Sequence, residues 1–587
     1  MAPEKVEIIE MSVNQTEQLE EESHRYQEQP PARLAQDDEL PPGYFRSKLF
    51  IGTYFAVAVS VLAGTGSFAI IAPLLNTINN ELGPDANVVW IGYTYTLCSA
   101  CAYVLIGRLG DLFGRRYLFI GGNFLSMIGA IIGSRAKSVN MVIGAMTILG
   151  VASSTQISFQ IIMGELVPLG KRFIVMATMF SWAIPFGGFG AGFGLTLTLH
   201  TASGWRSCFY LLAALDALAT VLFVLFYYPP TFHDIEKDKS KMRALREFDY
   251  LGLILFTGGF FVLLMGLSEG GAKYPWDSVA VIAPIIVGFF SIIAFVFWEI
   301  YGNLKAPYMP MHLFKNWRWV CMITCLGIGA AQFYAMALVW PQMIQALWPV
   351  TGDKYAWMSA TTGGCLIVGQ AFGGFLASKV SPRLILLTGT FAGTAFIGGA
   401  ACANEYNQTT VLVLVVIGFL LVGIQEAVCG TFATMALRDQ REIGTGGGLA
   451  GSARSGISAI GSVAYGSVLR NTLSEQIPKY VPAAAIKAGL PKTEVAQLIQ
   501  VLTGKAKAAT VAGLTPEILT TATHAYRQAA SIAFRNVLLT SVAFGCVSIV
   551  CAWFAPTIGK EKHGIVAGTL HKGERGEEEV EVHDEKV

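Results

Sequence analysis

The chain contains fourteen apolar runs, each long enough to cross a lipid bilayer as a helix. A helix rises about 1.5 Å per residue, so about 18 to 25 apolar residues cover a hydrocarbon core about 30 Å thick. With 53% hydrophobic and 14% charged residues, the 587-residue chain has too little polar surface to cover a soluble globule. We therefore predict an all-α polytopic membrane protein with spans at 49–71, 88–106, 117–134, 139–161, 174–198, 207–228, 250–267, 278–298, 319–340, 356–377, 383–403, 410–436, 443–468 and 533–556.

Lysine and arginine concentrate in alternate loops, those after the second, fourth and every later even-numbered span. This asymmetry predicts that both termini are cytoplasmic. The long segment 470–531 then lies outside, and its pattern predicts short amphipathic helices on the outer surface. The polar tails, 1–46 and 557–587, are predicted to be disordered and cytoplasmic.

A shift of 267 residues superimposes one part of the chain on another without gaps. Trp90 falls on Trp357, Gly107 on Gly374 and Arg116 on Arg383. Such an internal repeat is typical of transporters built from two parallel halves. We predict six-helix bundles at 47–228 and 318–556, joined by a charged linker and two inserted helices at 229–317.

The segment GRLGDLFGRR, residues 107–116, places four charged residues between the second and third spans. Glycines allow two helix ends to approach, and an acid here can accept from the first amides of the next helix and pair with arginines. We predict that this segment holds the bundles closed on the cytoplasmic side; the alternative is that its arginines only anchor helix ends. The predicted conformational latch comprises Gly107, Arg108, Asp111, Gly114, Arg115 and Arg116, with Gly374, Lys379 and Arg383 from the second copy.

GRLGDLFGRR resembles the signature G-x-L-(A/S)-D-x-x-G-R-(R/K) of the major facilitator superfamily, at the same place between helices 2 and 3. The second copy has Ser378 where the acid would stand, so we expect its half of the latch to be weaker. The resemblance implies the major facilitator fold, here with two inserted helices.

Further segments resemble the fourteen-helix drug:proton antiporters, and most of all the fungal trichothecene efflux pump family. They include GWRSCFYL after helix 5, FDYLGLILF at the start of helix 7, APYMPMHLFKN before helix 9 and VWPQMIQALW at its end. The similarity runs from about Leu49 to Pro556. It implies a secondary transporter that exports toxic or drug-like organic molecules, such as trichothecene-like mycotoxins, in exchange for protons across the plasma membrane or the vacuolar membrane.

Two positions differ from the wider antiporter pattern: Gly64 stands where helix 1 often has an aspartate, and Met146 where helix 4 often has an arginine. Proton coupling through these positions is therefore not expected. Helix 5 carries WAIPFGGFGAGFG, which is similar to the antiporter motif of a proline followed by closely spaced glycines. Because proline removes a helical hydrogen bond and glycines permit close packing, we expect a bending role for Pro185, Gly187, Gly188, Gly190 and Gly192.

Three ionisable residues lie deep within apolar runs, where an uncompensated charge costs a few kcal/mol or more. Glu426 and Arg454 lie on consecutive helices, each about 18 to 20 Å from the inner boundary, so we predict that they pair. The pair either faces a cavity and exchanges protons or substrate, or is a structural ion pair that fixes helix packing. Asp216, near the middle of helix 6, is a further candidate proton site.

Neutral polar and aromatic groups within the spans are candidates for lining an amphipathic substrate cavity. Gln156 and Gln160 are four residues apart, which predicts that they share one helix face. Each candidate also has a structural alternative as an interhelical hydrogen bond. The predicted cavity residues are Gln156, Gln160, Trp182, Gln332, Tyr334, Trp340, Gln342, Gln370 and Gln425.

The sequence contains no metal-ligand cluster, no nucleophile–base spacing and no ATP-binding loop, so we expect neither an enzyme nor a cofactor. The expected partners are a small organic substrate, protons and the lipid bilayer, with no nucleic acid, and we expect a monomer. Two alternatives stay open: an importer of the same fold, such as a siderophore–iron carrier, and a membrane receptor that binds without transport.

Overall fold

The computed structural model describes most of the chain between the two tails. The described residues are 35–36, 44–83, 85–168, 171–229, 248–270, 274–302, 304, 307–309, 311–435, 443–502, 511, 513–555 and 565–566. The predicted disordered tails and the charged linker at 230–247 thus lie almost entirely outside the description. Two short strands from the tails, β1 (Ala35–Gln36) and β2 (Ile565–Val566), pair antiparallel.

Thirteen of the fourteen predicted membrane-spanning helices are confirmed. Thirteen segments of the described chain are helical, long and apolar enough to cross a membrane, and they coincide with thirteen of the fourteen predicted spans. The remaining prediction, 443–468, is the first part of α20 (Ile443–Lys487), which packs along three neighbouring helices. Because its neighbours enclose it, α20 tolerates the many glycines and serines that lower its hydropathy.

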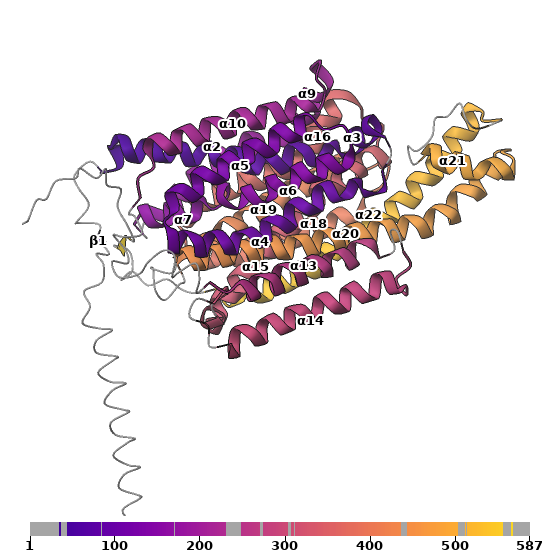
Figure 1. The fold of residues 1–587 in the computed structure, drawn as a ribbon. Coiled ribbons are helices and arrows are strands. Elements are labelled where there is room, and N and C mark those ends of the chain that lie inside the picture. The colour runs from indigo at the N-terminus through magenta and orange to yellow at the C-terminus, as the bar shows by residue number, and fades with distance from the viewer. Residues whose placement is uncertain are drawn as a thin grey trace, which may run out of the picture.

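The first half of the chain folds into one group of packed helices (Figure 1). Its last long helix packs on the first and on α5, while α6 packs between α4 and α5. The helices are α2 (Lys48–Ile71), α3 (Leu75–Leu82), α4 (Trp90–Phe113), α5 (Arg115–Ser134), α6 (Val139–Gln156), α7 (Phe159–Leu166), α8 (Arg172–Ala183), α9 (Gly190–His200) and α10 (Arg206–Phe226).

The second half forms a similar group, in which α19 packs between α17 and α18, and α20 between α15 and α22. The two groups meet where α20 packs on α4 and where α17 packs on α8. The helices besides α20 are α15 (Trp317–Leu347), α16 (Gly352–Ser359), α17 (Thr361–Ala377), α18 (Pro382–Gly399), α19 (Gln408–Met435) and α22 (Pro516–Trp553).

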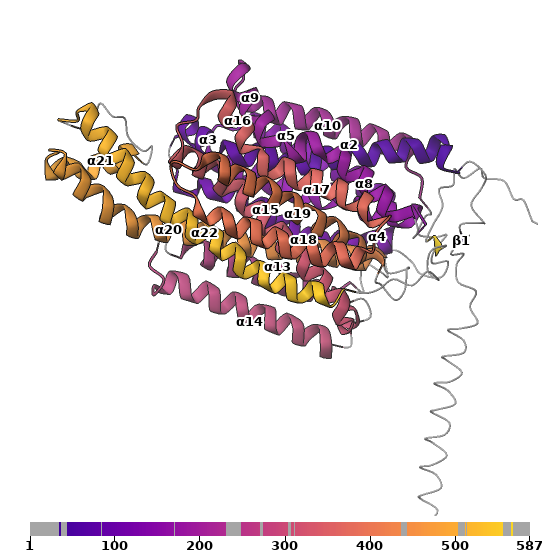
Figure 2. The same ribbon diagram turned by 180° about the vertical axis from the view of Figure 1, so that it is seen from behind.

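Two helices between the halves, α13 (Tyr250–Glu269) and α14 (Val279–Tyr301), pack mainly on each other. Figures 1 and 2 show α14 at the edge of the bundle, with α13 between it and the other helices. Large apolar side chains of α14, such as Val287, Phe290 and Phe297, are exposed. This surface suits contact with lipid tails rather than with water.

The expectation of short helices lying on the outer surface at 470–531 is wrong for most of that segment. Helices α20 and α22 continue past the ends of their neighbours, and only α21 (Val495–Leu502) is a separate short helix at the tip (Figures 1 and 2). The extension has its own apolar core, which includes Val481, Leu498, Ile518 and Ala529. Burial of these side chains between two long helices stabilises a projecting hairpin, which local amphipathic patterns do not reveal.

Candidate functional site

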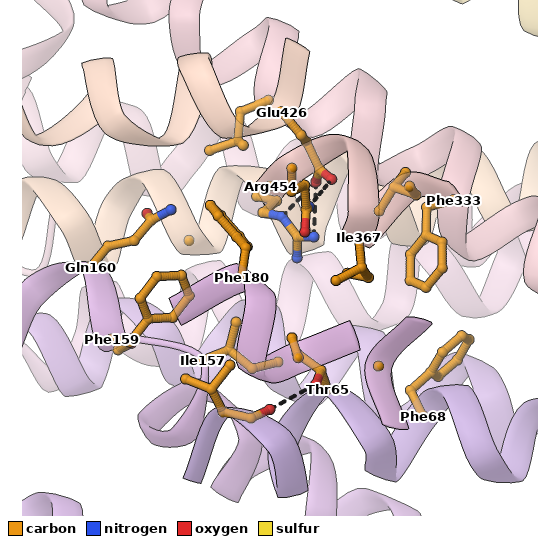
Figure 3. A pocket seen from close by; sticks show the side chains of 18 of the residues that line it. Thr65, Phe68, Ile157, Phe159, Gln160, Phe180, Phe333, Ile367, Glu426 and Arg454 are labelled. Carbon is orange, nitrogen blue, oxygen red and sulfur yellow. Dashed lines mark hydrogen bonds and ion pairs between the residues drawn. The ribbon is translucent and has the colours of Figure 1, made fainter. Parts of the chain in front are cut away.

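A hollow of about 890 Å³ lies near the middle of the bundle, between the two halves. Helices α2, α4, α7 and α8 line it from the first half, and α15, α17, α19 and α20 from the second. Its wall is mostly apolar and rich in aromatic rings, with a charged cluster at Glu426 and Arg454 and separate polar groups such as Thr65 and Gln160 (Figure 3). We name this hollow the central cavity.

A charged cluster on the second half faces the central cavity. Arg454 donates to Glu426 Oε1 from both Nε, at 2.9 Å, and Nη2, at 2.8 Å, while Gln370 Nε2 donates to Glu426 Oε2 at 2.6 Å. The Glu426 side chain is only 1% exposed and the Arg454 side chain 17%. Glu426 and Arg454, which were predicted to lie at the same depth on consecutive helices, are thus in contact. Gln370 of α17 joins them.

The Arg454 guanidinium also links the charged cluster to the first half of the chain. It lies over the ring of Tyr334, 5.7 Å from the ring centroid. Tyr334 in turn packs against Phe68 of α2, with ring centroids 4.7 Å apart. Glu426, Arg454, Tyr334 and Phe68 therefore form a continuous series of contacts across the boundary between the halves.

Glycines bring the halves together at one end of the bundle, which we name the Gly107 end. A Cβ atom on Gly107 would lie 2.6 Å from the Gly444 carbonyl oxygen, and one on Gly374 would lie 2.8 Å from the Ala177 Cβ. Gly107 and Gly374 are repeat partners at the 267-residue shift, and so are Ala177 and Gly444. The repeat therefore extends to the contacts between the halves.

At the opposite end, the His200 end, the halves meet through α9 and α16. The ring of Trp357 packs against that of Phe193, with centroids 5.6 Å apart, and against Gly192, where a Cβ atom would lie 2.9 Å from the ring. His200 Nε2 lies 3.1 Å from Asp353 Oδ1, and both side chains are exposed. Contacts between the halves therefore lie on both sides of the central cavity.

The glycine-rich motif of helix 5 makes both a bend and a set of close contacts. Pro185 lies in a π-helical turn, Ile184–Gly188, between α8 and α9, where Phe189 N donates to Ile184 O at 3.1 Å. Four of the five motif glycines pack on helices of both halves, and added Cβ atoms would lie 2.6 to 3.3 Å from their nearest neighbours. Gly187 meets Thr65, Gly188 meets Gly364, Gly190 meets Ala69 and Gly192 meets Trp357.

The predicted shared face of Gln156 and Gln160 is wrong. Helix α6 ends at Gln156, and a two-residue turn precedes α7. Hydroxyl groups at this break, including that of Ser158, donate to carbonyl oxygens of the preceding turn, an arrangement that bends helices. Gln160 consequently lines the central cavity, whereas Gln156 turns into the core of the first half.

Asp216 belongs to a buried polar network remote from the Glu426 cluster. Its carboxylate accepts from Gln156 Nε2 at 2.6 Å and from Ser126 Oγ at 2.7 Å. Gln156 Nε2 also donates to Asn123, which accepts from Ser60 as well. Because neutral donors satisfy both Asp216 oxygens, the network can hold α2, α5, α6 and α10 together without a counterion.

Replacing Asp216 with leucine is expected to destabilise the protein by about 1–3 kcal/mol, because Gln156 and Ser126 would lose their buried acceptor. Asp216→Asn retains an acceptor oxygen and should unfold close to the unmodified protein's temperature. Thermal unfolding in detergent measures both variants. If Asp216→Asn removes the pH dependence of transport, the network exchanges protons and its role is not only structural.

Most other predicted cavity residues point away from the central cavity. Gln332 donates to Ser541 O, Gln425 to Cys325 O and Ser548 Oγ, and Trp340 to Met358 O, so these three groups join helices within the second half. Trp182 is partly exposed and packs against Phe55. Gln342 lines a second, separate hollow. Of the nine predicted cavity residues, Gln160, Tyr334 and Gln370 line the central cavity.

The contacts that the structure shows for the latch arginines Arg115, Arg116 and Arg383 lie within their own halves, and closure of the bundles by this segment stays a prediction. Arg116 Nη2 donates to Val224 O at the end of α10, and its repeat partner Arg383 donates to Trp553 O at the end of α22, each at 3.0 Å. A cation at a helix carboxyl end is stabilising. Arg115 pairs with Glu165 of the same half.

The other latch residues add less to the contact between halves. Gly114 has a φ of 85° at the turn from α4 to α5, a conformation that favours glycine. Lys379 is exposed. The side chains of Arg108 and Asp111 lie outside the described part of the structure.

Sequence reasoning missed most residues of the cavity wall. Thr65, Tyr103, Phe159, Phe180 and Phe333 line it, together with Phe68. Each stands within an apolar run, where a side chain that faces a cavity resembles one that faces lipid. Their shared face becomes apparent only once the helices are assembled.

Comparison with known proteins agrees with this arrangement. A family model described as the fungal trichothecene efflux pump matches residues 12–560. A trichothecene efflux pump of Fusarium sporotrichioides is 27% identical over 528 residues, covering 88% of this chain and 87% of that protein. One of Trichoderma arundinaceum is 26% identical over 539 residues, covering 89% and 88%. An MFS-type transporter of Penicillium rubens is 27% identical over 491 residues, covering 81% and 86%.

Two packed halves around a central cavity, in a bundle of membrane-spanning helices, define a multi-pass transporter of the major facilitator type. The chain belongs to the fungal trichothecene efflux pump family. The family is one of transporters and not of enzymes, and it implies a small organic substrate.

Proposed function

We propose that this protein exports toxic organic molecules of the trichothecene type, apolar compounds with several oxygen acceptors, by alternating access. The observation that carries the proposal is the central cavity, which combines aromatic walls with one cluster of hydrogen-bonding groups at Glu426, Arg454 and Gln370. Such a surface suits a rigid apolar molecule that carries a few polar groups. The names of the Fusarium and Trichoderma relatives support the same substrate class.

Alternating access requires that each end of the bundle close in turn. The backbone approach of Gly107 to Gly444 would close one end, and the packing of Trp357 on Phe193 the other. Packed interfaces of this kind are bistable, so rocking of the halves would break one set of contacts while the other persists. The units that we expect to move relative to one another are residues 47–228, 229–317 and 318–556.

The proposed driving force is a proton gradient that acts through Glu426. Gly64, at the position where an aspartate is common, packs so closely on Gln156 that a Cβ atom would lie 2.6 Å from the Gln156 Cβ. Glu426 is the carboxylate that lines the central cavity among the described residues. Its protonation would release Arg454, whose contact with Tyr334 leads to the first half.

The alternation of basic loops supports cytoplasmic termini, so we assign the Gly107 end to the cytoplasm and the His200 end to the outside. The plasma membrane is the proposed location, with the vacuolar membrane as the second candidate. We expect the protein to act as a monomer, because one chain supplies both halves of the cavity.

Transport by inside-out membrane vesicles tests the proposal. Vesicles that contain the protein and are acidified inside are expected to accumulate a tritiated trichothecene, and collapse of the pH gradient should release it. Accumulation of a ferric siderophore in right-side-out vesicles would favour the importer. Saturable binding without accumulation in either orientation would favour the receptor.

A further inference from the structure

A second hollow, of about 520 Å³, also lies between the halves, and we name it the outer pocket. Leu75 and Tyr93 line it from the first half, and Leu338, Ser462 and Arg470 from the second. It shares no lining residue with the central cavity. Two separate hollows thus lie along the same boundary.

The outer pocket lies beyond the central cavity toward the His200 end. On α20, Arg470 follows Arg454 by 16 residues, which places it about 24 Å farther along the helix. On α15, Phe333 and Tyr334 line the central cavity, whereas Leu338, one turn later, lines the outer pocket. The contact between Phe68 and Tyr334 borders the central cavity on this side.

Among the polar groups that line the outer pocket, Arg470 can only donate hydrogen bonds, whereas Tyr93, Gln342 and Ser462 can donate or accept. Arg470 Nη2 makes two long hydrogen bonds, each 3.3 Å, to Ser268 O and Ser467 Oγ, and its buried Nε has no partner. No carboxylate within the described residues lies within ion-pair distance of Arg470. The Tyr93 hydroxyl lies beside the guanidinium. An oxygen acceptor, and above all an anionic one, would satisfy these donors.

We propose that the outer pocket is a second binding site for exported molecules, selective for those with a carboxylate or another strong oxygen acceptor at one end. Arg470 and Tyr93 bind the acceptor oxygens, and Leu75, Leu338 and Leu469 pack on the carbon body. The inference rests on the proposed export function, since a molecule that leaves the central cavity toward the His200 end would reach this pocket next. A substrate acid group would then be held here before release.

Binding of two fluorescent probes to the full chain tests the proposal. The protein is placed in nanodiscs of phosphatidylcholine, and energy transfer from tryptophan measures binding of 1-pyrenebutyrate and of the uncharged 1-pyrenebutanol. Arg470→Gln is expected to weaken pyrenebutyrate binding about tenfold, the loss typical of a charge-assisted hydrogen bond, and to change pyrenebutanol binding less than about twofold. Arg535→Gln, which removes an exposed arginine of α22, is the matched control and should bind both probes normally.

Two results would overturn the proposal. One is that Arg470→Gln binds pyrenebutyrate as well as the unmodified protein does. The other is that added phosphatidylglycerol abolishes the Arg470-dependent binding, which would assign the pocket to a lipid headgroup. If Arg470→Gln fails to fold, Arg470→Lys keeps the charge but loses the planar donors, and an intermediate loss of affinity is expected. The binding measurement does not depend on transport. If the vesicle assay shows no transport but binding still depends on Arg470, the export function is contradicted and the binding site is not.

Discussion

Glu426→Gln is expected to reduce gradient-driven accumulation of substrate at least about tenfold and to remove its dependence on pH. The change is nearly isosteric: Arg454 can still donate to the side-chain oxygen, and the new amide nitrogen can donate to Gln370 Oε1 once the Gln370 amide rotates. What disappears is the exchangeable proton and the negative charge that balances Arg454 in a buried site. Exchange of labelled for unlabelled substrate, which needs no net proton movement, should persist at all pH values.

The same variant must be separated from a purely structural loss. Removing one partner of a buried ion pair costs about 3–5 kcal/mol because a charge is left uncompensated. The double variant Glu426→Gln with Arg454→Gln removes both charges and should recover thermal stability. A structural pair predicts that pH-dependent transport recovers as well, whereas a proton site predicts that it does not.

Asp216→Asn supplies the matched control, because it neutralises another buried carboxyl without touching the central cavity. It should retain the pH dependence of accumulation. Vesicle uptake measured over a series of imposed pH gradients compares all three variants. A Glu426→Gln protein that responds to the gradient like the unmodified one would refute the proton role.

The membrane spans were predictable because the bilayer imposes a length and an apolar composition on every helix that crosses it. The pairing of Glu426 with Arg454 was predictable for a related reason: the constant rise of a helix converts sequence distance into depth. Depth does not determine which way a side chain points, however. Gln425, the neighbour of Glu426 in the chain, faces α22 and not the central cavity.

Two features of the helices escaped prediction: a break at Gln156 and a long projecting hairpin. The break after Gln156 has no proline or glycine, and it depends on hydroxyl groups that bond to the backbone. The long hairpin of α20 and α22 contains Pro478 and Pro482, which locally favour a loop. Val481 and Ile518 nevertheless lie in its apolar core. In this hairpin, tertiary burial outweighed local propensity.

The glycines of the latch segment illustrate the same limit. The internal repeat of the sequence related Gly107 to Gly374, and the motif indicated a tight turn between helices. The structure adds the partner surfaces, Gly444 and Ala177, which lie on the other half in each case. The contact between the halves at this end therefore depends on the absence of side chains, whereas Arg116 and Arg383 each donate a hydrogen bond within their own half.

Gly107→Ala is expected to slow transport about tenfold or more while the protein still folds. The new Cβ atom would lie 2.6 Å from the Gly444 carbonyl oxygen and 3.0 Å from the Gly448 Cα, and neither backbone atom can move aside cheaply. Alanine otherwise stabilises a helix by about 0.5–1 kcal/mol relative to glycine. An overpacking penalty of about 1–3 kcal/mol acts only where the halves touch, so it selectively destabilises the state closed at the Gly107 end.

Gly144→Ala makes the same chemical change in helix α6, where a Cβ atom meets nothing within 4 Å, and it should transport normally. Hydrogen–deuterium exchange of the amides at the Gly107 end of α4 and α20 should rise in Gly107→Ala and remain unchanged in Gly144→Ala, because only the former holds these helices apart. Equal exchange and equal transport in the two variants would mean that closure does not use this contact. Gly374→Ala, which would bring a Cβ atom to 3.0 Å from the Phe173 carbonyl oxygen, should behave like Gly107→Ala, since the internal repeat makes the two contacts equivalent.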